Sequence, residues 1–155
     1  MNIIEGNKKD KNFNFAIIQS RFNEEICDGL LSGALNCLKE SGYNENNIPV
    51  IKVPGAFEIP LVAEKLASQN KYDAIICLGA VIKGETAHFE YVSKAVTDGI
   101  LQVGLKYGVP VIFGVLTTYD ESQAKERSGE RENNKGWEAA ITAIEMASLM
   151  KKIGS

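Results

Sequence analysis

The residues with the clearest chemistry lie in one stretch, residues 79–92, which reads GAVIKGETAHFEYV. The stretch begins as an apolar strand, turns through Lys83, Gly84, Glu85 and Thr86, and then takes up a helical pattern with His88, the only histidine of the chain. A glycine turn before a helix N-terminus binds anions through backbone N–H groups and the helix dipole. An imidazole exchanges protons near neutral pH. The stretch therefore predicts a phosphate site beside a proton carrier, although a lone histidine is often structural and Gly84 can serve an ordinary turn.

Aromatic and acidic side chains follow the other predicted strands. Phe22 follows the first strand, Phe57 and Glu58 follow the second, and Phe113 lies in the fourth. Ligands of parallel α/β sheets bind beyond the carboxyl ends of the strands, where aromatic faces suit a flat heterocycle and a carboxylate accepts hydrogen bonds from hydroxyls. Two structural alternatives remain, because Phe22 can staple a helix start and Glu58 can complement a helix dipole.

Three basic residues, Arg127, Arg131 and Lys135, surround a polar segment at residues 128–134. A guanidinium group can donate two parallel hydrogen bonds to phosphate oxygens, so the three residues are candidates for binding a phosphate. Glutamates alternate with these cations, which is typical of a solvated surface. From residue types alone, the solvated surface is the favoured interpretation.

The elements that must position these residues alternate between strand and helix. Apolar runs predict strands at residues 13–19, 48–53, 74–81 and 111–116. Helical spacing predicts a first helix with Asn23 as its N-cap, a second at residues 59–67, a third that ends at Gly108, a short helix with a capping box from Thr118 to Glu121, and a last helix through residues 140–149. Nearly continuous apolar strands joined by helices indicate a parallel sheet with both faces covered. The predicted fold class is α/β: a three-layer sandwich with a four-stranded, flavodoxin-like sheet.

Length and composition limit the classes of function. The 155 residues fit a single domain, residues 1–155, with a tail at residues 1–12 that either frays or adds an edge strand to a neighbouring subunit. A net charge of −3 argues against a nucleic-acid partner, and no apolar run approaches the roughly 20 residues that span a membrane. Without a signal segment, the cytoplasm is the expected location. The cysteines, Cys27, Cys37 and Cys77, lack metal-ligand spacing and are expected to be inert.

Taken together, the strand-end segments resemble the lumazine synthase family. The matching pieces are RFN at residues 21–23, VPGAFEIP at 53–60, the stretch at 79–92, PVIFGVLT at 110–117, and Arg127 followed by NKG at 134–136. The resemblance covers nearly the whole chain, and the motifs occur in the family's order.

The resemblance implies a transferase of riboflavin biosynthesis that condenses 5-amino-6-(D-ribitylamino)uracil with 3,4-dihydroxy-2-butanone 4-phosphate. The product is 6,7-dimethyl-8-ribityllumazine, and phosphate and water are released. The reaction proceeds through an imine, loss of phosphate, tautomerisation and ring closure, so that positioning two substrates and moving protons account for much of the catalysis. It implies no metal and no cofactor.

The resemblance also implies a role for each matching residue. Phe22 would stack on the pyrimidine, and His88 would carry protons. The ribityl chain would be received by Ala56, Phe57 and Glu58, and the ring edge by Ala80, Val81, Ile82 and Lys83. The butanone phosphate would be held by Gly84, Glu85, Thr86 and Arg127, and Phe113 of a neighbouring subunit would complete the pocket, with Lys135 near the same boundary.

Assembly is a further implication of the resemblance. The family forms pentamers, often twelve of them in a 60-subunit icosahedral shell, and the short loop at residues 128–134 favours the shell. Riboflavin synthase would be a partner inside it. The alternatives are a non-catalytic lumazine- or flavin-binding shell protein, which would need no proton carrier, and a flavodoxin-like or receiver-like signalling domain, which would need an acidic cluster that these strand ends lack.

Overall fold

A four-stranded parallel sheet forms the middle layer of the protein, which is described by a computed structural model over residues 1–154. The strands are β1 (Phe15–Ser20), β2 (Val50–Val53), β3 (Ala74–Ile82) and β4 (Val111–Thr118), in the order β2-β1-β3-β4. Every residue of β1 is buried, as is all of β3 except Ile82, because these two strands lie in the centre of the sheet. The long apolar run of β3 thus reflects burial on both faces.

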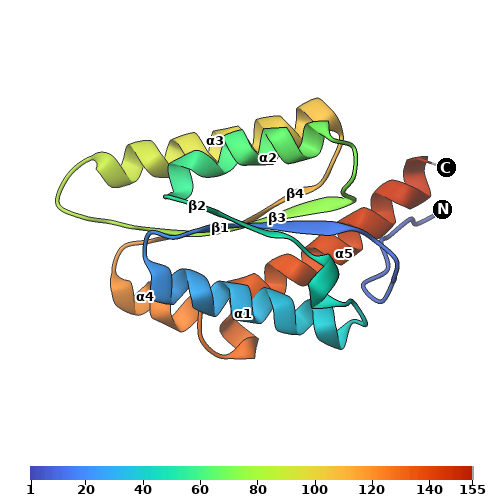
Figure 1. The fold of residues 1–155 in the computed structure, drawn as a ribbon, viewed down its shortest axis with the longest axis horizontal. Coiled ribbons are helices and arrows are strands. Elements are labelled where there is room, and N and C mark those ends of the chain that lie inside the picture. The colour runs from blue at the N-terminus through green and yellow to red at the C-terminus, as the bar shows by residue number, and fades with distance from the viewer. Residues whose placement is uncertain (155) are drawn as a thin grey trace.

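Helices cover both faces of this sheet (Figure 1). They are α1 (Glu24–Glu40), α2 (Ile59–Ser68), α3 (His88–Tyr107), α4 (Glu121–Arg127) and α5 (Lys135–Gly154), with short 3₁₀ turns at Glu45–Asn47, Ala56–Glu58 and Arg131–Asn133. One core lies between the sheet and α1 and α5, and a second lies between the sheet and α2 and α3. The predicted α/β three-layer class with a flavodoxin-like sheet is confirmed.

Of the two predicted helix caps, Asn23 lies at the N-cap position of α1 as predicted, whereas the capping box from Thr118 is wrong. Asn23 precedes α1 in a left-handed conformation (φ 61°, ψ 52°), and its side chain caps no N–H group of that helix. The short helix α4 is capped by Asp120, whose carboxylate accepts a hydrogen bond from the backbone N–H of Gln123 at 2.8 Å, while Thr118 still belongs to β4. The strand before α4 extends further than its apolar run indicated, so the cap of α4 lies two residues later than predicted.

The N-terminal tail runs beside α5 of the same chain. The backbone N–H of Asn7 donates to Ser148 Oγ at 2.9 Å, and the Ser148 hydroxyl donates to Asp10 at 2.6 Å. Gly6 lies so close to the helix that a Cβ there would approach the carbonyl oxygen of Glu145 at 2.0 Å. No strand is assigned within residues 1–14, so the edge strand on a neighbouring subunit stays a prediction. Within residues 1–154, no helix is both long and apolar enough to span a membrane.

Candidate active site

A cavity of about 590 Å³ opens at the carboxyl ends of β1, β2 and β3, on the side of α2 and α3. Its wall contains the predicted site residues Phe22, Ala56, Phe57, Glu58, Ala80, Val81, Ile82 and His88, together with Asn23, Pro54, Gly55, Phe89, Tyr91 and Val92. This first cavity therefore brings together the residues expected around the pyrimidine, the ribityl chain and the proton carrier.

Backbone hydrogen bonds fix the segment that carries Phe22. The N–H of Arg21 donates to the carbonyl of Val53 at 2.8 Å, and the N–H of Phe22 donates to that of Pro54 at 3.2 Å. These bonds continue the β1–β2 ladder beyond the last strand residues. Phe22 leaves this ladder with 69% of its surface exposed, so it does not act as a buried staple for α1. An aromatic ring held by rigid backbone yet open to solvent is suited to stacking on a planar ligand.

Three aromatic side chains surround the same cavity with large exposed surfaces. Phe57 is 61% exposed and Tyr91 is 74% exposed, and both line the cavity together with Phe22. Tyr91 and Val92 were missed as site residues by the sequence reasoning. Their spacing from His88 would have indicated them, because His88 begins α3 and residues three and four positions later lie on the same helix face.

His88 lies at the first position of α3 and is exposed to solvent at the wall of the first cavity. Its backbone N–H donates to Thr86 Oγ1 at 3.4 Å, and the preceding residue, Ala87, gives the helix no side-chain cap. The positive end of the helix dipole therefore faces the turn before it. This geometry fits the anion site that the glycine turn predicts.

The residues of that turn line neither large cavity of the single chain. Lys83, Gly84, Glu85 and Thr86 are exposed, and an added Cβ at Gly84 would meet no atom within 4 Å. The N–H of Lys83 donates to the carbonyl of Thr118 at 2.9 Å, which extends the pairing of β3 with β4 into the start of the turn. The turn thus lies at the boundary between the first cavity and the edge strand β4.

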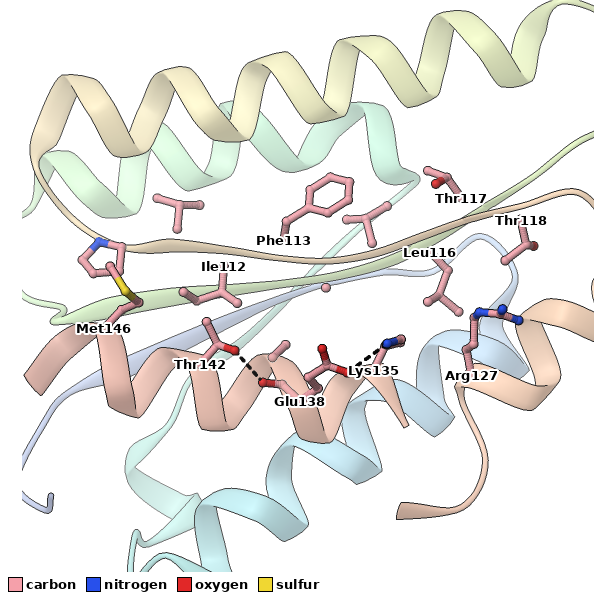
Figure 2. A pocket seen from close by; sticks show the side chains of 15 residues that line it. Ile112, Phe113, Leu116, Thr117, Thr118, Arg127, Lys135, Glu138, Thr142 and Met146 are labelled. Carbon is pink, nitrogen blue, oxygen red and sulfur yellow. Dashed lines mark hydrogen bonds and ion pairs between the residues drawn. The ribbon is translucent and has the colours of Figure 1, made fainter. Parts of the chain in front are cut away.

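A second hollow, of about 610 Å³, runs along β4 at the edge of the sheet (Figure 2). This edge groove contains the remaining predicted site residues, Phe113, Arg127 and Lys135. Figure 2 shows Phe113 on one face of β4 and Lys135 on the other, with Arg127 near the strand's carboxyl end. The lining residues of the edge groove and of the first cavity do not overlap. Within one chain, the predicted site is therefore divided between the first cavity, the edge groove and the turn at residues 83–86, which lines neither.

The cations of the edge groove contact polar groups of their own helices. Lys135 Nζ lies 2.9 Å from Glu138 Oε2, and Arg127 Nη1 donates to the backbone carbonyl of Gln123 at 3.0 Å. Arg131, the third member of the basic trio, lies elsewhere: its guanidinium stacks 3.8 Å from the ring centroid of Trp137 and pairs with Glu40 at 3.2 Å. The trio therefore does not converge, and only Arg127 and Lys135 remain as candidates for binding a phosphate.

The cysteines are buried and free, and their environment suppresses the reactive thiolate. Burial raises the pKa of Cys27 from 9.0 to about 12, helped by the nearby charge of Asp28, and raises that of Cys37 to about 11. The same desolvation raises the pKa of Cys77 still further. Over residues 1–154, no group of three or more histidine, cysteine or acidic side chains is placed to hold a metal ion.

A family model described as 6,7-dimethyl-8-ribityllumazine synthase matches residues 12–151 of the 155-residue chain. The chain belongs to the 6,7-dimethyl-8-ribityllumazine synthase family. Lumazine synthases are transferases of riboflavin biosynthesis that act on small molecules and form oligomers. The matched range contains every strand, both cavities and His88, so the family resemblance noted from the motifs, its fold and its enzymatic function are confirmed.

Proposed function

We propose that this lumazine synthase builds its active site from two copies of the chain, with the first cavity of one copy facing the edge groove of the next. The division of the predicted site residues between two cavities supports this proposal most strongly. The first cavity has aromatic faces and Glu58 but no arginine or lysine in its wall, whereas the edge groove has Arg127 and Lys135. One substrate is a flat heterocycle, which suits the aromatic first cavity, and the other carries a phosphate, which suits the cations of the edge groove. The pair therefore needs both cavities.

In the first cavity, 5-amino-6-(D-ribitylamino)uracil stacks on Phe22, and its ribityl hydroxyls reach Ala56, Phe57 and Glu58. A carboxylate accepts hydrogen bonds from hydroxyls, and the 3₁₀ turn Ala56–Glu58 places these three residues in the cavity wall. The polar edge of the ring lies along Ala80, Val81 and Ile82, with Lys83 beside them. These roles agree with the exposed aromatic surface and the rigid strand ends.

The phosphate of 3,4-dihydroxy-2-butanone 4-phosphate binds between the turn at Gly84, Glu85 and Thr86 and Arg127 of the adjacent copy. The helix dipole of α3 and a guanidinium both stabilise the phosphate as it leaves. Lys135 lies near the same boundary, and Phe113 closes the pocket over the ring. No metal or organic cofactor takes part in these steps.

His88 moves protons between the condensing groups. The uracil 5-amino group attacks the ketone, and loss of one water gives an imine. The C–O bond to phosphate then breaks as a proton leaves the neighbouring carbon, and the resulting enol tautomerises to a ketone. The ribityl-bearing nitrogen attacks this ketone, and loss of a second water closes the ring. His88 accepts and donates the protons of these steps from the N-terminus of α3.

The shared site requires an oligomer, which we propose to be a pentamer, with twelve pentamers forming a 60-subunit shell. The unpaired edge of β4 and the exposed side chains of Leu61 (73%), Leu101 (60%) and Leu105 (75%) on α2 and α3 support extensive subunit contacts. The chain is proposed to act in the cytoplasm, and riboflavin synthase is the proposed occupant of the shell. Sedimentation that gives a monomer would contradict the shared site.

Mixed assemblies test the shared site directly. One chain carries Phe22→Ala and His88→Ala in the first cavity, and the other carries Phe113→Ala and Arg127→Ala in the edge groove. After unfolding and joint reassembly at equal amounts, about a quarter of the sites should contain no substitution, because each site draws one half from each of two neighbours. Lumazine absorbance and phosphate release should then exceed the values for either chain reassembled alone. Activity no higher than the average of the two would place both halves on one chain.

A further inference from the structure

The side chain of Asn134 forms an unusually complete set of hydrogen bonds just before Lys135. Its Nδ2 donates to the carbonyl oxygens of Gly29 at 3.0 Å and Gly129 at 2.9 Å. Its Oδ1 accepts from the N–H groups of Gly136 at 2.8 Å and Trp137 at 3.1 Å. Both donors and both acceptor positions of the amide are used, and the residue is only 4% exposed.

These bonds connect three separate parts of the chain. The acceptor half caps the N-terminus of α5, the helix that begins with Lys135. One donor reaches back across the loop to Gly129, two residues after Arg127, and the other reaches Gly29 in α1. The end of α4 and the start of α5, which carry the two cations of the edge groove, are therefore tied to each other and to α1 by one side chain.

Glycines give this amide the space that it occupies. A Cβ at Gly33 of α1 would lie 2.1 Å from Asn134 Oδ1, and one at Gly29 would lie 2.3 Å from the carbonyl oxygen of Ser128. A Cβ at Gly136 would lie 1.9 Å from the carbonyl oxygen of Leu30. Each contact is far shorter than real Cβ atoms allow, so the loop at residues 128–136 rests on a surface of α1 that only glycine provides.

Neither cation is fixed strongly by its own contacts. Lys135 is exposed and pairs with Glu138, and Arg127 contacts the carbonyl of Gln123 in its own helix. The positions of their backbones therefore decide where the two charges meet a ligand. Those positions depend on the loop that Asn134 holds against α1.

We infer that Asn134 is a positioning residue that sets the spacing of Arg127 and Lys135 for the phosphate of the substrate. This inference rests on the proposed function, because it requires that these two cations bind that phosphate. A misplacement of even about 1 Å strongly weakens recognition by fixed charges and slows reactions that depend on orientation. Asn134 touches no substrate and acts only through the two cations.

Asn134→Asp and Asn134→Ala separate the contributions of the amide's donor nitrogen and its acceptor oxygen. The aspartate keeps both acceptor bonds and still caps α5, but it turns a carboxylate oxygen toward the carbonyls of Gly29 and Gly129. We expect Asn134→Asp to remain folded and to raise the KM for 3,4-dihydroxy-2-butanone 4-phosphate about tenfold, with the KM for the uracil substrate changed less than about twofold. The inhibition constant of inorganic phosphate should rise in parallel. Asn134→Ala should show at least the same selective effect.

Asn133→Ala is the matched control, since Asn133 is exposed in the same loop, and it should behave as the unaltered protein. The fluorescence of Trp137, the only tryptophan, reports whether each variant keeps the α5 N-terminus folded. An unchanged KM for the phosphorylated substrate in Asn134→Asp would overturn the inference, as would equal increases in the KM for both substrates.

Arg127→Ala distinguishes a failure of the proposed phosphate site from a failure of the positioning role alone. If it leaves the KM of the phosphorylated substrate unchanged, the proposed phosphate site is wrong. If it raises that KM while Asn134→Asp does not, only the positioning role is wrong.

Discussion

The side-chain amide of Asn23 donates a hydrogen bond to the backbone carbonyl of Ala80 at 3.0 Å. This contact joins the segment after β1 to β3 near its end, and both residues line the first cavity. Asn23 also has a positive φ of 61°, which asparagine tolerates better than most residues. Asn23 thus has two roles. Its left-handed backbone follows Phe22 directly, and its side chain ties this segment to β3.

Asn23→Gly and Asn23→Ala should separate these two contributions. Glycine keeps the left-handed backbone and loses only the hydrogen bond, so it should lower the free energy of unfolding by about 1 kcal/mol. Alanine loses the bond and strains the backbone, which should cost about 1 kcal/mol more. Urea unfolding measures both values. Equal stability of the two variants would show that the positive φ carries no cost at this site.

His88→Ala should slow turnover by about 10- to 100-fold without abolishing it, because much of the rate comes from holding two substrates together. The KM values should change little, since His88 binds neither the ribityl chain nor the phosphate in the proposed site. Initial rates over a range of concentrations of both substrates would measure the loss in turnover and the KM values. Glu90→Ala, in the same exposed turn, is the control. A complete loss of activity with normal binding would mean that proton transfer dominates.

Gly114→Ala should destabilise the protein by about 1–3 kcal/mol, because it inserts a methyl group into a filled space. The new Cβ would lie 2.7 Å from the carbonyl oxygen of Cys77 and 2.8 Å from Leu78 Cδ2. Gly84→Ala provides the comparison, since a Cβ there meets no atom within 4 Å. Chemical denaturation of both variants checks the difference. Similar stabilities would show that β4 shifts freely at the sheet edge.

The folded protein should resist alkylation by iodoacetamide at neutral pH. Thiolate is the reactive form, and burial raises the pKa of Cys27 to about 12 and that of Cys37 to about 11. Far below these values the thiols stay protonated, and the rate should rise only as the pH approaches them. Mass spectrometry should find the cysteines unmodified in the native protein and all modified in denaturant. Rapid labelling of Cys37 alone would indicate local opening of the α1 C-terminus.

The sheet and its helices were predictable from the sequence because each strand is a short apolar run and each connection contains a helical pattern. The predicted strand at residues 74–81 corresponds to β3, Ala74–Ile82, and the one at 111–116 to β4, Val111–Thr118. The predicted strands at residues 13–19 and 48–53 begin two residues earlier than β1 and β2, and the prediction at 111–116 stops before the polar residues that continue β4. Thr117 and Thr118 pair with Val81 and Ile82, although their side chains gave no apolar signal.

The residues of the first cavity were also predictable, since strand ends in a parallel sheet converge at one edge. The hydrogen bonds of Asn23 and Asn134 were not. Asn23 binds a carbonyl 57 residues away, and Asn134 binds one 105 residues away. Short polar side chains form such bonds only after the backbone has folded, so local spacing carries no trace of their partners. Tyr91 was missed although its spacing from His88 places both residues on one face of the helix.

The unpaired edge of β4 exposes the newly synthesised chain to aggregation before it assembles. An exposed edge strand offers unpaired backbone groups to any other strand, and so invites aggregation while the chain is alone. In the proposed assembly this same edge faces the next copy, beside the groove with Arg127 and Lys135. A chain without neighbours would then be both inactive and prone to aggregate. Selection for catalysis and selection against aggregation would act on the same strand, which leaves β4 little freedom to change.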